Sequence, residues 1–197
     1  MPRPNQSQQK RRDLLPIIAR AFAELGYRRV TTAELATRCD VRENILYRLW
    51  PDKKAMFIAA IEYVYELSAA TWGRLLIESG STDGAAAKLL DYESHHHGEF
   101  GHYRIIFAGL SETDDPDIRR ALRHVYGQFH SFVRAQIEGH RRAGKPRKNP
   151  DAALAAWAFV GLGTVANICR ELGLLNDRER KCLMTDIGEL MLQGAKG

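Results

Sequence analysis

Cysteine is scarce in this sequence, and its few thiols are poorly placed for pairing. The three cysteines, Cys39, Cys169 and Cys182, are odd in number, lie far apart and include no CxxC pair. This spacing argues against a disulfide framework or a zinc site, so a reducing compartment is the expected setting.

Apolar segments of the kind that target or cross membranes are also lacking. The N-terminus, MPRPNQSQQKRR, is polar and basic without the apolar core of a signal peptide. No apolar run reaches the roughly 18 residues that a membrane-spanning helix needs. We therefore expect a cytoplasmic protein with no membrane partner.

Alternating strand patterns are missing, whereas helical periodicity runs through nearly the whole chain. We predict an all-α fold of about nine helices, with a three-helix N-terminal domain over residues 1–52 and a larger helical domain over residues 53–197. Residues 1–9 are expected to form a disordered arm. The expected helices are 10–25, one beginning at Thr31, and 42–50, 53–79, 84–97, 101–113, 116–143, 150–173 and 177–194.

The excess of positive over negative charge is confined to the first part of the chain. Residues 1–60 carry 12 Lys and Arg against 6 Asp and Glu, whereas the remaining residues carry 17 against 18. Such an asymmetry favours a polyanionic partner for the N-terminal domain, although a solvated basic face would give the same count.

The segment 31–53, TTAELATRCDVRENILYRLWPDK, predicts two short helices joined by a tight turn. Thr31 with Glu34 three residues later forms a capping-box pattern, and Asp40 suits a turn that needs a positive φ. Asp52 is placed to cap the helix that follows Pro51. Basic and polar side chains collect on the second short helix, as in helix-turn-helix proteins that place a helix in the major groove.

In this segment the sequence resembles the TetR family of bacterial transcriptional repressors. The matching positions, in order, are Thr31, Thr32, Leu35, Ala36, Val41, Leu46, Tyr47, Trp50, Asp52 and Lys53. The resemblance implies an all-α helix-turn-helix domain followed by a helical ligand-binding and dimerisation domain.

The resemblance also implies DNA contacts at defined positions. Phosphate contacts are expected from Thr31 or Thr32, Tyr47 and Lys53, because hydroxyl and ammonium groups donate to phosphate oxygens without distinguishing bases. The groove-facing residues would be Arg42, Glu43, Asn44 and Arg48. Arg can bind guanine, Asn can pair with adenine and Glu can accept from cytosine.

Four positions depart from the family pattern. Asp40 stands where Gly is usual, Asn44 where a small residue or Pro is common, Ile45 where a hydroxyl residue is frequent, and Leu49 where Tyr or His is frequent. The last two changes remove expected DNA contacts, which indicates an unusual operator.

Four histidines, His95, His96, His97 and His102, form the most conspicuous cluster of the larger domain. Together with Glu99 they offer an alternative function, a metal-dependent helical enzyme or metal sensor. Three consecutive histidines on a helix point in different directions, which favours a polar helix end over a metal site. The sequence holds no nucleophile motif, no Gly-rich phosphate loop and no HExxH, so we expect neither enzyme activity nor a cofactor.

Two C-terminal segments are suited to dimerisation. Residues 152–169 are apolar nearly all round and rich in small residues, and residues 177–194 carry an apolar stripe. With the resemblance, they predict a four-helix homodimer interface through 150–173 and 177–194. The aromatic residues of the larger domain, together with the family resemblance, predict a pocket for a largely apolar small-molecule effector. Double-stranded operator DNA is the expected macromolecular partner.

Overall fold

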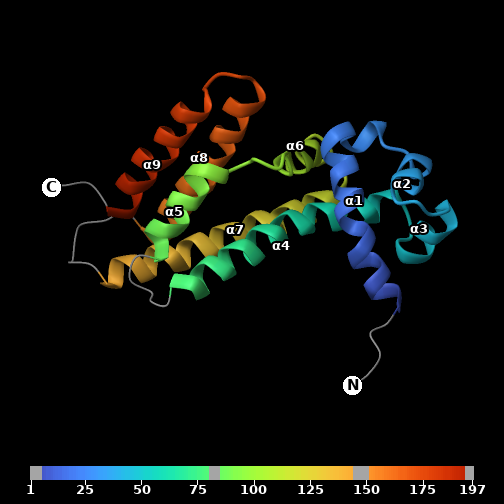
Figure 1. Cartoon of the computed structure of the whole chain (residues 1–197), viewed down its shortest axis with the longest axis horizontal. Coiled ribbons are helices and arrows are strands. Elements are labelled where there is room, and N and C mark those ends of the chain that lie inside the picture. The colour runs from blue at the N-terminus through green and yellow to red at the C-terminus, as the bar shows by residue number, and fades with distance from the viewer. Residues whose placement is uncertain (1–5, 80–84, 144–150, 194–197) are drawn as a thin grey trace. The chain divides into compact units, whose positions relative to one another are not determined.

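The computed structural model describes residues 6–79, 85–143 and 151–193, and these residues form nine α-helices with no strand (Figure 1). This confirms the predicted all-α fold, and most expected helix ends lie within a few residues of those observed. The helices are α1 (Gln6–Arg29), α2 (Thr32–Arg38), α3 (Glu43–Leu49), α4 (Lys53–Ser79), α5 (Ala85–His96), α6 (Tyr103–Leu110), α7 (Pro116–Ala143), α8 (Ala152–Glu171) and α9 (Asp177–Gln193).

The N-terminal helix α1 begins earlier than the sequence predicted. Residues 6–9 are helical, so the expectation of a disordered arm over residues 1–9 is wrong for that part, while residues 1–5 lie outside the described residues. Gln, Lys and Arg are good helix formers, which favours this extension. Pro16 lies inside α1. Arg12, four residues earlier, is exposed, so water can satisfy the carbonyl that the proline leaves without a donor.

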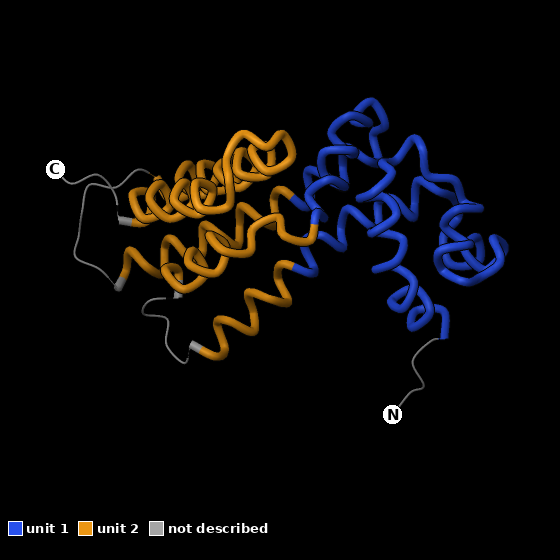
Figure 2. Tube along the Cα trace, turned by 45° about the horizontal axis from the view of Figure 1, so that its top comes forward, with its two compact units in different colours: residues 1–67, 101–125 blue, residues 68–100, 126–197 orange. Residues whose placement is uncertain are grey.

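The chain divides into two compact units (Figure 2). The first unit holds residues 1–67 and 101–125, and the second holds residues 68–100 and 126–197. The first unit therefore combines the helix-turn-helix segment with α6 and the first turns of α7. The expected functional boundary after residue 52 stays a prediction, since compactness alone does not test it.

The core of the first unit lies where α1 packs against α2, α3 and α6. Ile18 and Phe22 of α1 are fully buried, as are Leu35 and Leu46 of the two short helices. The Phe22 ring meets Phe57 of α4 edge to face, with ring centroids 4.9 Å apart. Burying such side chains is the main force that holds the short helices in place, because isolated seven-residue helices are unstable in water.

The second unit is built from α5, α8, α9 and the C-terminal parts of α4 and α7. A buried cluster joins side chains of α5, α7, α8 and α9, with Leu90, Ile137, Ala156 and Leu192 among its members. Close contact between α5 and α9 depends on Gly188, where an added Cβ would lie 2.4 Å from the Leu90 side chain. This unit therefore has its own hydrophobic core.

Helix α8 is apolar on its outer side as well as its inner side. By length and hydropathy it is the one described helix that could cross a membrane, with 33% of the tested window buried. Core and interface helices of soluble proteins meet the same criteria. Large apolar side chains exposed on α8 and in the turn after it are Leu154, Trp157, Val165, Ile168, Leu172 and Leu174.

Candidate nucleic-acid interface

The turn between α1 and α2 sets the start of the helix-turn-helix segment. Gly26 has φ 74° and ψ 164°, so the chain turns there before the last residues of α1. This positive-φ conformation is essentially restricted to glycine. Thr31 then caps α2, and its Oγ1 accepts a hydrogen bond from the Glu34 N–H at 3.1 Å.

The expected capping box is only half formed. The Glu34 carboxylate pairs with Arg38 one turn later, with Arg38 Nε 2.7 Å from Glu34 Oε1. Arg38 also contacts Glu24 of α1, which ties α2 to α1. Arg38 was not among the predicted site residues, although its spacing of four residues from Glu34 is a known helix-pairing signal.

The tight turn between α2 and α3 follows the prediction for Asp40. This residue has φ 50°, and among the described non-glycine residues it alone has a positive φ. Val41 N–H donates to the Ala36 carbonyl oxygen at 3.0 Å and closes the turn. Leu46 and Trp50 of the next segment are buried, as the spacing of four predicted.

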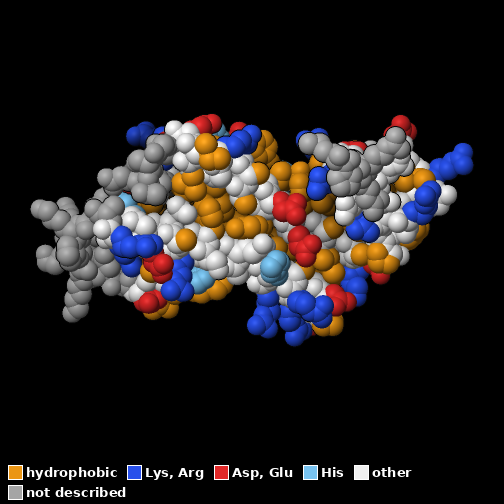
Figure 3. All heavy atoms as spheres, turned by 90° about the horizontal axis from the view of Figure 1, so that it is seen from below, with side chains coloured by type: hydrophobic (Ala, Val, Ile, Leu, Met, Phe, Trp, Pro, Cys, Tyr) orange, Lys and Arg blue, Asp and Glu red, His pale blue; other side chains and the backbone are white. Residues whose placement is uncertain are grey.

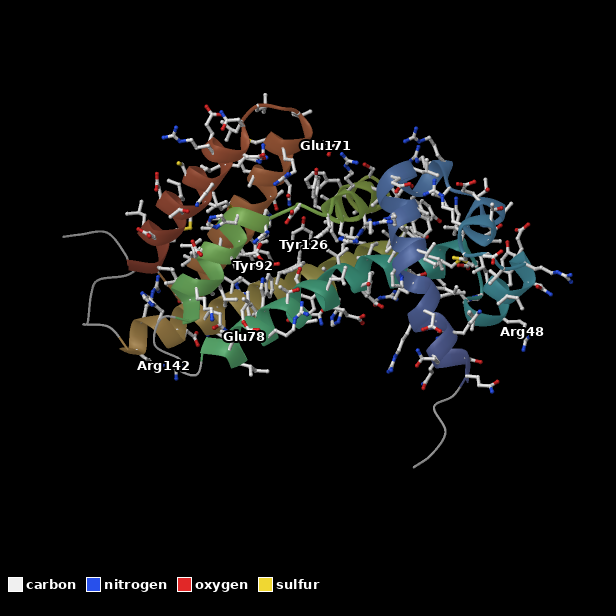
Figure 4. All side chains as sticks on the ribbon, viewed as in Figure 1. Arg48, Glu78, Tyr92, Tyr126, Arg142 and Glu171 are labelled. Carbon is white, nitrogen blue, oxygen red and sulfur yellow. The ribbon has the colours of Figure 1, made fainter. Side chains whose placement is uncertain are left out.

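The predicted groove-facing residues share the exposed side of α3. Arg42 is the N-cap residue, Glu43 and Asn44 form the first turn, and Arg48 lies in the last turn. All four side chains are exposed, and the labelled Arg48 projects outward from the helix (Figure 4). This surface exposes guanidinium, amide and carboxylate groups, which are groups that can hydrogen-bond to base edges.

Tyr47 lies on the same helix and is 48% exposed. Its hydroxyl donates to Oγ1 of Thr32 at 3.1 Å, which joins the two short helices. The structure thus brings together Tyr47 and Thr32, both predicted phosphate contacts. Thr31, the alternative phosphate contact, is exposed at the N-terminus of α2, where unpaired N–H groups favour anions.

Lys53 has hydrogen-bond partners inside the protein in addition to its predicted contact with a DNA phosphate. Its Nζ donates to the carbonyl oxygens of Tyr27 and Val30, both at 3.0 Å, and lies 4.5 Å from the centre of the Tyr27 ring. An ammonium has three N–H donors, so at most one is available for phosphate. No sequence pattern indicated these contacts, because they join residues that are 23 and 26 positions apart.

Basic residues of α1 lie beside the short helices. The Arg11 guanidinium carbon is 5.8 Å from the centre of the Trp50 ring. Burial raises the pKa of the nearby Cys39 thiol, and the positive charge of Lys10 acts to lower it. On one face of the molecule, Lys and Arg side chains collect in separate groups, several of them next to Asp or Glu (Figure 3).

The histidine cluster does not converge on one point. His96 Nδ1 lies 2.8 Å from Glu99, whereas His95 Nε2 accepts from Lys181 of α9. His97 lies 2.7 Å from Glu93 and 3.0 Å from the carbonyl oxygen of Gly163. No group of three or more His, Cys, Asp or Glu side chains suited to a metal ion is found in the described part of the chain.

His97 instead belongs to a polar network inside the second unit. The Trp72 indole donates to Glu93 Oε1 at 2.6 Å, and His97 occupies the other carboxylate oxygen. Partial burial acts to raise the pKa of Glu93, but the hydrogen bonds from His97 and Trp72 bring it below its ordinary value. His102 belongs to the first unit, where its ring meets that of Tyr63 edge to face with centroids 6.5 Å apart. The arrangement joins α4, α5 and α8 and does not favour the metal-site alternative.

Comparison with known proteins agrees with the geometry of the first unit. Residues 17–60 match the family model of bacterial regulatory proteins of the tetR family. Over these residues the chain is similar to that family. The match covers the second half of α1, both short helices and the start of α4, which are the elements that place the exposed side of α3.

One curated relative and two solved structures are also similar to the chain. The chain is 32% identical over 79 residues to the nucleoid occlusion factor SlmA of Photobacterium profundum, which is 40% of either chain. The chain thus spans about two fifths of that relative's length.

The two solved structures show the same fold over nearly the whole chain. A TetR-family regulator from Cytophaga hutchinsonii has a TM-score of 0.78 at 15% identity, covering 96% of both chains. A protein from Saccharomonospora viridis, solved with choline, has a TM-score of 0.74 at 18% identity, covering 93% of this chain and 96% of its own. These similarities show that the chain has the all-α fold of these two proteins.

Proposed function

We propose that this TetR-family protein represses transcription by binding a palindromic operator as a homodimer and is released by a small-molecule effector. The exposed side of α3 carries the proposal, because Arg42, Asn44 and Arg48 lie there with free access to solvent. Tyr47, Thr31 or Thr32, and Lys53 would bind the flanking phosphates. Glu43 would accept a hydrogen bond from a cytosine amino group.

The exposed apolar surface of α8 supports dimerisation. Trp157 is 48% exposed and Leu154 is 67% exposed on this helix, and Leu190 of α9 is 57% exposed. A second copy of the chain would cover these side chains through α8 and α9. Two copies of α3 would then need to lie about 34–36 Å apart to enter successive major grooves.

An effector would act by changing that separation. The second unit contains stacked aromatic rings, with the Trp72 and Phe132 centroids 4.5 Å apart, that supply apolar surface. The similar protein from Saccharomonospora viridis was solved with choline, which supports a ligand-binding role for this fold. Because coupling is reciprocal, operator DNA would weaken effector binding by the same factor by which the effector weakens DNA binding.

Selection of bound sequences from random duplex DNA tests the proposal most directly. We expect an enriched inverted repeat and binding that weakens steeply with salt, because phosphate contacts release counterions. Because the proposed operator is chromosomal DNA, the protein would be located in the cytoplasm. Absence of any enriched sequence, together with salt-independent binding, would contradict the proposal. Stoichiometric metal in the purified protein would instead favour the alternative based on His95, His96, His97 and His102.

A further inference from the structure

An acidic connection between α6 and α7 contacts the beginning of α4 and the end of α1. Lys54 Nζ lies 2.8 Å from Asp117 Oδ2 and 3.1 Å from Asp115 Oδ2. Arg28 Nε lies 2.6 Å from Glu112 Oε1. We call these five residues the acidic clamp. Its members all belong to the first unit.

The clamp differs from an isolated surface ion pair because Asp115 has two structural roles. Its Oδ1 accepts from the N–H groups of Asp117 and Ile118 at 2.9 and 3.2 Å, which caps α7. Its Oδ2 contacts Lys54 at the same time. Hydrogen bonding to Lys54 also lowers the pKa of Asp117. The direction of the first turn of α7 is thereby linked to the first turn of α4.

The start of α4 is held on its other side by Lys53. That neighbouring lysine donates to the Tyr27 and Val30 carbonyl oxygens immediately before α2. Asp52 caps the same turn through the Ala55 N–H at 2.7 Å. Two consecutive lysines thus connect α4 to the α1–α2 turn and to the α6–α7 connection.

We propose that the acidic clamp makes α6 and the first turns of α7 move with the helix-turn-helix segment and so positions α3 for DNA. Arg28, Lys54, Glu112, Asp115 and Asp117 are positioning residues, and this inference rests on the proposed function. An effector signal then enters the first unit where the chain passes between the units, at residues 67–68, 100–101 and 125–126. Gly101, at the second of these places, has φ 69°.

Replacing both aspartates tests the clamp, because the clamp and simple charge repulsion predict opposite changes in DNA affinity. Asp115→Asn with Asp117→Asn removes two negative charges, which alone would strengthen binding to the DNA polyanion. Asn is as good an N-cap as Asp, so α7 keeps its cap. We expect the double variant to bind operator DNA roughly three- to tenfold more weakly at fixed salt, the range appropriate to partly exposed ion pairs.

Asp114→Asn is the matched control. Asp114 lies in the same connection and is exposed, and no ion pair of this residue is found among the described residues. Removing its charge should leave DNA affinity unchanged or slightly raised. Tighter binding by the Asp115/Asp117 double variant, or equal effects of the control and the double variant, would overturn the clamp.

A second experiment tests the same contacts by replacing Lys54. Lys54→Met should weaken DNA binding, and adding it to the Asp115/Asp117 double variant should cost little more, because the contact is already lost. Additive effects would overturn the proposal. Failure of the unmodified protein to bind duplex DNA would instead reject the proposed function, so the two failures are distinguishable.

Discussion

The Nζ atom of Lys53 donates a hydrogen bond to the carbonyl oxygen of Val30 at 3.0 Å. Val30 is the last residue before the Thr31 cap, so this bond fixes where α2 begins. Lys53 therefore has a role inside the protein as well as its proposed role at the DNA backbone.

Lys53→Met should reveal both roles of this lysine. Loss of hydrogen bonds from a charged donor should lower the free energy of unfolding by about 1–3 kcal/mol. The slope of log affinity against log salt should become shallower by no more than about one phosphate contact. Chemical denaturation and salt titrations of operator binding measure the two effects. Unchanged stability would contradict the structural role, and an unchanged slope would contradict the phosphate contact.

Variants of α3 should separate positioning contacts from base recognition. Tyr47→Ala should weaken binding to all duplex sequences alike, because a phosphate contact does not read bases. Arg42→Ala or Arg48→Ala should relax preference at particular base pairs, each by about 1–3 kcal/mol of discrimination. Repeating the sequence selection with each variant measures this. Identical sequence preferences in all three would mean that α3 does not enter the groove.

The exposed side of α8 gives a prediction about assembly. Trp157→Asp should place a charge in the proposed interface, shift the protein toward monomer and weaken operator binding, as followed by sedimentation and DNA titration. Ile77→Asp is the control, because Ile77 is 82% exposed on α4, outside the proposed interface. If both variants sediment like the unmodified protein, the α8 surface does not mediate dimerisation.

His102 predicts a dependence of stability on pH. Partial burial and then the nearby charge of Arg20 lower the pKa of His102. Below about pH 6.5, the ordinary value, the unfolded chain therefore binds a proton that the folded chain resists. The His102 contribution to stability is fully present above that pH and is lost as the pH falls toward the folded-state pKa.

Denaturation between pH 8 and pH 5 measures this effect. His102→Gln should flatten the profile, while the control His124→Gln, at an exposed histidine of α7, should not. A profile that His102→Gln leaves unchanged would show that other groups cause the dependence.

Substitution of Gly26 should cost stability through backbone conformation alone. A Cβ at this position meets nothing within 4 Å, but φ is 74°. Gly26→Ala should therefore destabilise the protein by about 1–3 kcal/mol through backbone strain. Gly127→Ala is the matched control, because α7 offers equal space at an ordinary helical residue. It should stabilise by about 0.5–1 kcal/mol, as expected for helix propensity. Equal thermal shifts in the two variants would contradict the interpretation of Gly26.

The parts of the fold that depend on local sequence were predictable. Thr31 and Asp52 cap their helices as expected, Asp40 adopts its positive φ, and Leu46 and Trp50 are buried. Each of these outcomes depends on residues within about one helical turn. The start of α1 was not predicted, because residues 6–9 are polar and lack apolar periodicity although they are helical.

Contacts between distant residues were not predictable from one sequence. The pairs Lys54–Asp117 and Arg28–Glu112 join residues 63 and 84 positions apart. Periodicity shows which face of a helix is apolar but not which other helix covers it. The packing of α1 against α6, and the division of the histidines among different partners, therefore emerged only in the structure. The base and phosphate contacts of α3 stay predictions.

The packing of α6 on α1 bears on how the DNA-binding part could be produced alone. A fragment ending at residue 52 would lack α6, whose Ile105 and Ile106 are buried in the first unit. It would also lack Phe57, which packs on Phe22. Such an excised peptide would leave the inner side of α1 in water and forfeit much of its hydrophobic stabilisation. We therefore expect the smallest autonomously folding piece that contains α3 to include two stretches of chain separated by more than thirty residues.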